Sequence, residues 1–267
     1  MCQLLGMNCN VPTDICFSFE GFCARGGKTD DHRDGWGIAF FEGLGCRLFL
    51  DAKPSITSPV AELVRRYPIH STHVIAHIRK ATQGKIALEN CHPFRREMWG
   101  RYWVFAHNGD LPDLDSENAG FYQAVGMTDS ERAFCLILET LRQHFPQRKP
   151  TLAALYPVLK EMTKTLAKKG VFNYLLSDGE HFFAHCSTQL SYIVRQAPFA
   201  AAHLVDQDLT VDFQELAGPE DRVAVIATTP LTDNEVWTQI QPGELLVFQD
   251  GLPLQFLMNT KNNSLSL

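Results

Sequence analysis

The pattern of hydrophobic and polar residues predicts a chain built mainly of short antiparallel strands. Short apolar runs end at glycine-rich or polar turns, which is typical of strands in hairpins. One hairpin is expected around 43–45 and another around Ser177-Asp178-Gly179. The expected strands are 2–7, 36–41, 46–50, 73–78, 101–106, 171–176, 181–186, 191–194, 222–227 and 244–248.

Two longer stretches follow the 3.6-residue period of a helix. Apolar residues recur at 134, 137, 138 and 141, after Thr128-Asp129-Ser130-Glu131, which predicts a helix capped by Thr128 or Asp129. A second helix is expected at 151–168, and a short one at 60–66 with Ser58 as its N-cap. Hairpins combined with a pair of helices favour an α+β fold over a parallel βαβ fold.

The composition is that of a globular protein with one large domain. The 267 residues are 45% hydrophobic and 20% charged, which is ample for a core. The net charge of -6 gives no overall basic surface for nucleic acid. No uninterrupted apolar run is long enough to span a bilayer, so no membrane association is expected. We expect one domain at 1–258 and a polar tail at 259–267, with no second domain.

The N-terminus and the cysteines favour a cytoplasmic protein. The first residues have neither the basic segment nor the long apolar segment of a secretory signal. The eight cysteines are scattered through apolar segments and form no CxxC pair, which favours reduced thiols over disulfides or zinc ligands. We expect no metal and no other cofactor.

Candidate chemistry begins at Cys2. If Met1 is removed, a thiol and a free α-amine lie on one residue. The thiolate is a strong nucleophile, and an α-amine with a reference pKa of about 7.7–8.0 can act as its base. Taken alone, Cys2 is more simply interpreted as a small apolar residue at the start of a strand.

Polar residues at two other predicted strand ends have both structural and functional interpretations. Arg79 can bind a carboxylate through two parallel hydrogen bonds, or it can be a surface ion-pair partner. Asn108-Gly109 is typical of a tight turn, and its side-chain amide and backbone N–H can also stabilise an oxyanion.

Two further sets of polar residues are weaker candidates. Asp129 can hold a substrate ammonium or serve as a helix N-cap. His70, His73 and His77 raise the question of a metal site, but no cysteine or carboxylate at suitable spacing completes the set. We therefore interpret these histidines as structural.

In their order along the chain, these segments resemble the class II glutamine amidotransferases, whose nucleophile is N-terminal. The resemblance spans nearly the whole chain and includes the γ-glutamyl amide hydrolases of ergothioneine and glutathione metabolism. It implies an Ntn-hydrolase fold, a four-layer αββα sandwich of two mainly antiparallel sheets. The matching segments are Met1-Cys2, Asp34-Gly35-Trp36-Gly37, His77-x-Arg79-x-Ala81-Thr82-x-Gly84, His92-Pro93-Phe94, His107-Asn108-Gly109 and Thr128-Asp129-Ser130-Glu131.

The resemblance also implies a role for each matching residue. Cys2 would be the nucleophile and its own α-amine the base. Arg79, assisted by Thr82, would bind the substrate α-carboxylate, and Asp129 the α-ammonium. Asn108 and Gly109 would form the oxyanion hole. The sequence departs from better-known members at Lys80, where they have tryptophan. This departure affects the expected closure of the pocket and not the expected chemistry.

These roles predict hydrolysis of glutamine or a γ-glutamyl amide through a thioester to glutamate and ammonia or an amine. The opposite charges of Arg79 and Asp129 suit the zwitterionic end of such a substrate. The alternatives are an Ntn hydrolase that acts on other amides and a non-catalytic binding protein with the same pocket. The physiological amide, the oligomeric state and a separate protein that accepts the ammonia remain open at this point.

Overall fold

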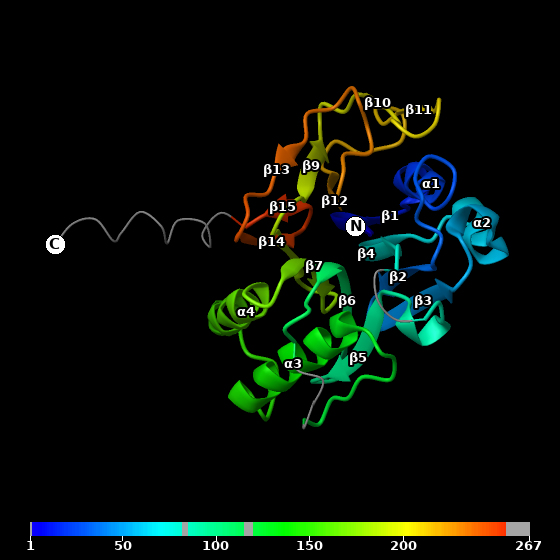
Figure 1. Ribbon diagram of the computed structural model, residues 1–267. Coiled ribbons are helices and arrows are strands. Elements are labelled where there is room, and N and C mark those ends of the chain that lie inside the picture. The colour runs from blue at the N-terminus through cyan, green and yellow to red at the C-terminus, as the bar shows by residue number, and fades with distance from the viewer. Residues whose placement is uncertain (1, 82–84, 115–119, 255–267) are drawn as a thin grey trace.

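The computed structural model describes residues 2–81, 85–114 and 120–254. Two β-sheets form the centre of the molecule, and helices lie on both sides of it (Figure 1). The helices are α1 (Cys16–Ala24), α2 (Pro59–Arg66), α3 (Asp129–His144) and α4 (Leu152–Ala167), with short 3₁₀ turns η1 (Ser55–Thr57) and η2 (Leu88–Asn90).

The strands form two large antiparallel sheets and one small pair. The seven-stranded sheet has the order β13 (Thr238–Gln239), β9 (Ser191–Gln196), β12 (Arg222–Ala227), β1 (Gln3–Thr13), β4 (Ser71–Ile78), β2 (Trp36–Glu42) and β3 (Gly45–Asp51). The six-stranded sheet has the order β15 (Leu252–Pro253), β14 (Leu245–Gln249), β8 (Phe182–His185), β7 (Val171–Ser177), β6 (Arg101–Asp110) and β5 (Phe94–Met98). The small pair is β10 (Ala201–His203) and β11 (Thr210–Asp212).

Three apolar cores hold these layers together. One lies between the sheets and includes Leu4 and Ala106. The second packs α1 and α2 on the seven-stranded sheet, with Phe19 buried there. The third packs α3 and α4 on the six-stranded sheet around Phe105 and Phe134, whose rings stack 5.2 Å apart. The order helix, sheet, sheet, helix confirms the expected αββα sandwich.

The central strands are buried on both faces because successive side chains point to opposite sides of a sheet. On β1, Leu4 faces the core between the sheets, and Leu5 faces the core beneath α1 and α2. On β6, Phe105 faces α3, and Ala106 faces the opposite sheet. Full burial of a leucine or phenylalanine contributes about 1.5–3 kcal/mol, so these strands are rigid supports for residues at their ends.

Most of the expected elements are confirmed, including the hairpins β2–β3 and β7–β8 and the helices α3 and α4. Ser58 caps α2 as predicted, since its Oγ accepts a hydrogen bond from the N–H of Ala61 at 3.3 Å. The strands β5, β10, β11, β13 and β15 were not expected. Among the described residues, no helix is long and apolar enough to cross a membrane.

The tight-turn interpretation of Asn108-Gly109 is wrong. Both residues lie within β6, and they pair with Asn173 and Phe172 of β7. The glycine serves close packing of the backbone, because a Cβ at Gly109 would lie 1.8 Å from the carbonyl oxygen of Val171. Asn108-Gly109 therefore stands within a strand and forms no turn.

Candidate active site

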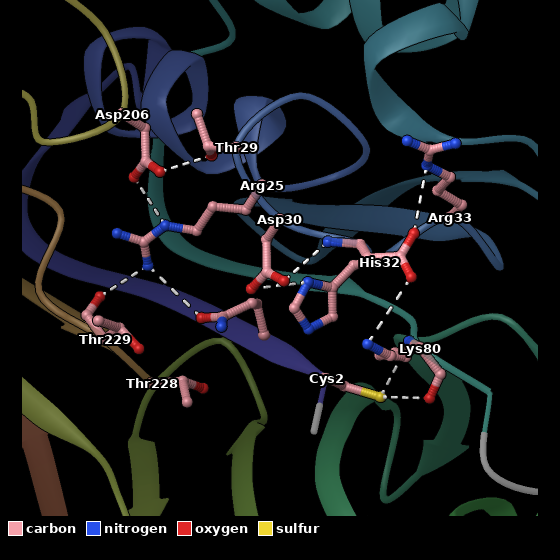
Figure 2. Close-up of polar contacts among 12 residues, drawn as sticks. Cys2, Arg25, Thr29, Asp30, His32, Arg33, Lys80, Asp206, Thr228 and Thr229 are labelled. Atoms are coloured by element: carbon pink, nitrogen blue, oxygen red, sulfur yellow. Dashed lines mark hydrogen bonds and ion pairs between the residues drawn. The ribbon is translucent and has the colours of Figure 1, made fainter.

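Cys2 lies immediately before the central strand β1, with a half-buried side chain. Its sulfur contacts the backbone of Lys80 (Figure 2): the Lys80 N–H donates to Sγ at 3.3 Å, and the thiol faces the Lys80 carbonyl at 3.4 Å. Arg79 is opposite Cys2 across the β1–β4 ladder, because the adjoining pair is Gln3 with Ile78. The strand pairing thus brings the predicted nucleophile and the predicted carboxylate-binding cation together.

Burial raises the pKa of the Cys2 thiol, while the Lys80 N–H and the charge of Arg79 act in the opposite direction. The raised pKa means that Cys2 is a neutral thiol near pH 7, and a base has to remove its proton before it attacks. Among the described residues, the hydrogen-bond partners of Sγ are both backbone atoms of Lys80.

The buried histidines near the site are unsuited to that task. Burial lowers the pKa of His77 to about 3 and the pKa of His92 well below its usual value. The two rings pack against each other with centroids 4.2 Å apart. His107 is engaged elsewhere, with Nδ1 2.8 Å from Ser130 Oγ and Nε2 2.9 Å from the Val171 carbonyl. These three histidines are therefore poorly suited to take the proton of the Cys2 thiol.

The Asn108 side chain is fully buried and is joined to β1 through Thr228. Its Nδ2 donates to Thr228 Oγ1 at 3.3 Å, and the same oxygen accepts from the Leu4 N–H at 2.9 Å. Asn108 Oδ1 has no hydrogen-bond partner among the described residues. Rotating the amide by 180° lets the Thr228 hydroxyl donate to Oδ1 and turns the two N–H donors toward the position without a partner. This is the property of an oxyanion donor.

Gly109 offers a second donor beside Asn108. The Phe172 N–H donates to Ser187 Oγ at 3.1 Å and the Phe172 carbonyl faces His185 Nδ1 at 2.6 Å, so both groups are directed away from β6. In an antiparallel ladder this makes Gly109–Phe172 a pair without mutual backbone hydrogen bonds, and the Gly109 N–H points away from β7. Strand β5 does not reach that side, because its first pair is Phe94 with Phe105.

Asp129 is the first residue of α3, and Thr128 is its side-chain cap. Asp129 Oδ2 accepts from the Leu111 N–H at 2.6 Å, and Oδ1 accepts from the Ser130 N–H at 2.8 Å. These bonds hold the carboxylate close to the chain that follows Gly109. A carboxylate has about four acceptor positions, so capacity remains for a substrate ammonium.

Arg79 follows β4 and is 4% exposed. Its backbone is fixed by the Asp34-Gly35 segment: the Arg79 N–H donates to the Gly35 carbonyl at 2.8 Å, and its carbonyl accepts from the Asp34 N–H at 3.1 Å. Asp34 Oδ2 also accepts from the Ala81 N–H at 2.8 Å. The Arg79 guanidinium donates to the Lys85 carbonyl at 3.2 Å. Thr82, predicted to assist Arg79, lies outside the described residues.

Arg25 ties together the chain segments around Cys2 (Figure 2). Its guanidinium is buried and pairs with Asp206 at 2.7 Å. It also donates to Gln3 Oε1 at 3.4 Å, the Thr229 carbonyl at 2.9 Å and the Pro230 carbonyl at 2.7 Å. Gln3 follows Cys2, and Thr229 follows Thr228, the partner of Asn108. The Arg25 side chain therefore fixes both of these segments.

Sequence reasoning missed Thr228, Asp34 and Arg25. Thr228 follows a predicted strand as an ordinary polar residue, and the residue it holds, Asn108, is 120 positions away in sequence. Asp34 stands in a segment that was recognised, but its bond to Ala81 depends on the fold. The packing of the two sheets reveals the role of Thr228, and contacts among the ends of the seven-stranded sheet and its loops reveal those of Asp34 and Arg25.

The three histidines considered as metal ligands have separate environments. His70 is exposed, while His73 bonds to Asn8 and His77 packs on His92, so the three do not form a metal site among the described residues. A separate cavity of about 640 Å³ is lined in part by Phe17, Arg195 and Phe213.

Comparisons with known proteins identify the family of the chain. The family model of class II glutamine amidotransferases matches residues 1–266. The chain is 54% identical to YafJ of Escherichia coli K12 over 248 residues, covering 93% of this chain and 97% of that protein. It is 48% identical to a crystal structure of a predicted glutamine amidotransferase from Pseudomonas aeruginosa PA01, with a TM-score of 0.76 and coverage of 94% and 99%.

A more distant structure supports the fold alone. Glutamine phosphoribosylpyrophosphate amidotransferase of Bacillus subtilis is 14% identical, with a TM-score of 0.60 and coverage of 94% of this chain and 48% of that chain. The two sheets, their helical layers and the match along almost the whole sequence lead to one conclusion. The chain belongs to the class II glutamine amidotransferases, enzymes with an N-terminal cysteine nucleophile.

Proposed function

We propose that this protein hydrolyses the side-chain amide of glutamine or of a γ-glutamyl amide through a γ-glutamyl thioester on Cys2. The observation that carries the proposal is the convergence of four kinds of group at one end of the two sheets. Cys2 and Arg79 face each other across β1–β4, Asn108 is joined to β1 through Thr228, and Asp129 is held beside the end of β6.

In this mechanism the α-amine of Cys2, freed by removal of Met1, takes the thiol proton. The sulfur attacks the amide carbon, and the resulting oxyanion accepts hydrogen bonds from Asn108 and Gly109. The tetrahedral intermediate collapses as the protonated α-amine of Cys2 gives its proton to the leaving nitrogen, which departs as ammonia or an amine. Water then attacks the thioester, and glutamate and the Cys2 thiol are released.

Substrate binding follows from the two opposite charges. Arg79, with Thr82, binds the α-carboxylate in two parallel hydrogen bonds, and Asp129 binds the α-ammonium. An Ntn hydrolase for amides without this zwitterion would have no use for such a pair of charges, so we favour the γ-glutamyl substrate.

The direct experiment is incubation of the purified protein with glutamine and with γ-glutamyl amides, followed by measurement of glutamate and ammonia or amine. Wild-type protein is expected to release both products in equal amounts, and Cys2→Ala is expected to release none. Absence of turnover by a chain shown to lack Met1 would support the non-catalytic binding protein. Ammonia that appears only after another protein is added would identify a separate acceptor or activator.

A further inference from the structure

Lys80 combines contact with the nucleophile and a side chain in solvent. Its backbone N–H and carbonyl both lie within 3.4 Å of Cys2 Sγ. The Lys80 side chain is 45% exposed, and its ammonium pairs with Asp31. Figure 2 shows Lys80 beside the Cys2 sulfur. The mechanism above uses the backbone of this residue but gives its positive charge no task.

The ion pair of Lys80 is loose and replaceable. Its Nζ lies 3.9 Å from Asp31 Oδ2, at the outer limit of an ion pair, and the Asp31 side chain is 73% exposed. Asp31 has a second cation, since Arg33 Nε lies 3.4 Å from Asp31 Oδ1. Exposed pairs of this kind are worth only about 0–1 kcal/mol. Lys80 can therefore exchange Asp31 for a substrate anion while Arg33 continues to neutralise Asp31.

The position of Lys80 relative to the reacting groups indicates which part of the substrate its side chain would contact. Arg79 and Asp129 are assigned to the α-carboxylate and α-ammonium, and Asn108 and Gly109 to the carbonyl oxygen. The remaining substituent on the attacked carbon is the leaving nitrogen. Because the Lys80 backbone touches the attacking sulfur, its flexible side chain can reach a group attached to that nitrogen.

We infer that Lys80 binds a carboxylate carried by the leaving amine, so that the preferred substrate is a γ-glutamyl conjugate of an amino acid or peptide. This inference rests on the proposed function and deepens it by naming the substrate class. Free glutamine lacks this group and forgoes the contact.

The test compares γ-glutamylglycine with γ-glutamylglycinamide. The leaving amine carries a carboxylate in the first substrate and a neutral amide in the second. We expect wild-type protein to favour γ-glutamylglycine in kcat/KM by about three- to fivefold, the order that an ion pair of a half-exposed lysine gives. Lys80→Met keeps the backbone contacts to Cys2 and is expected to reduce the ratio of the two kcat/KM values to about one. Lys80→Glu should bring that ratio below one.

Lys28→Met is the matched control, because it removes an exposed lysine from a nearby loop and should leave the ratio as in the wild type. Equal kcat/KM for the two substrates in wild-type protein would overturn the inference while leaving amide hydrolysis intact. A ratio in Lys80→Met that stays at the wild-type value would also overturn it, since the positive charge would then have no part in recognition. Failure of wild-type protein to hydrolyse any γ-glutamyl amide would instead reject the proposed function.

Discussion

At the scale of single residues, the site depends on side chains whose partners lie far away in the sequence. The Asn108 amide is held by Thr228, and Thr228 is held by the backbone of Leu4, two residues beyond Cys2. This chain of bonds makes the orientation of one buried amide a property of both sheets. The same bonds hold the Asn108 amide in place for the oxyanion role proposed above.

Replacement of Asn108 by Ala should lower kcat by about 10²–10³-fold, because one oxyanion donor is lost while the substrate-binding charges remain. KM should change little. Steady-state kinetics with glutamine measures both parameters. Thr228→Val is a useful companion, since it leaves Asn108 in place and removes only the group that orients it. An Asn108→Ala variant with wild-type kcat would exclude this residue from the oxyanion hole.

Replacement of Arg79 by Ala should discriminate between substrates that differ at the α-carboxylate. With glutamine, a charged bidentate contact is lost, and kcat/KM should fall at least about tenfold more than with the glutamine α-methyl ester. The two substrates are compared on the same protein preparation, so the fold of the variant is its own control. The same loss on acid and ester would mean that Arg79 only supports the fold around Gly35 and Lys85.

At the scale of elements, the active site is assembled from strand ends that loops hold in place. Arg25 follows α1 and bonds to the segments that contain Gln3, Asp206, Thr229 and Pro230. The loop between α1 and β2 therefore takes part in fixing β1 at the point where the nucleophile precedes it.

Arg25→Met should lower the melting temperature by about 5 °C, since removal of this cation leaves Asp206 poorly paired and costs on the order of 2 kcal/mol. Differential scanning calorimetry measures the change. Arg66→Met is the matched control, because it removes an 81% exposed arginine that pairs only at the surface with Glu62. An equal effect of the two substitutions would contradict a structural role for the Arg25 network.

Prediction from sequence worked best where pattern and chemistry are local. The hairpin β2–β3 has its turn between two apolar runs. Ser58 caps α2 by accepting a hydrogen bond from Ala61, only three residues further along the chain. Asn108-Gly109 predicts a turn but lies in a strand, because the close approach of Val171, which requires the glycine, is set by strand pairing. Thr228 and Arg25 could not be predicted, since all their partners named above except Gln3 are more than 100 residues away in sequence.

At the scale of the whole molecule, the described residues form four layers held by three apolar cores. Several histidines are buried in or beside these cores without charge. Burial lowers the pKa of His73 and His185 to about 4, and that of His77 to about 3. In the unfolded chain the same residues titrate near pH 6.5.

Stability should therefore fall as the pH decreases from about 6.5 toward 4. In this window the unfolded chain binds protons that the folded chain excludes, so each such histidine steepens the loss by up to about 1.4 kcal/mol per pH unit. Urea unfolding at a series of pH values measures the slope. His185→Gln should reduce the slope, whereas His203→Gln should not, because a hydrogen bond to Asp233 raises the pKa of His203. A flat profile from pH 7 to 4.5 would contradict this account.

The most direct test of the central claim is the intact mass of the protein before and after incubation with 6-diazo-5-oxo-norleucine, a reactive analogue of glutamine. We predict that Met1 is absent and that one molecule of the analogue becomes attached to Cys2, with glutamine slowing the reaction. A chain that retains Met1 and still hydrolyses glutamine, or an adduct on a cysteine other than Cys2, would contradict the mechanism.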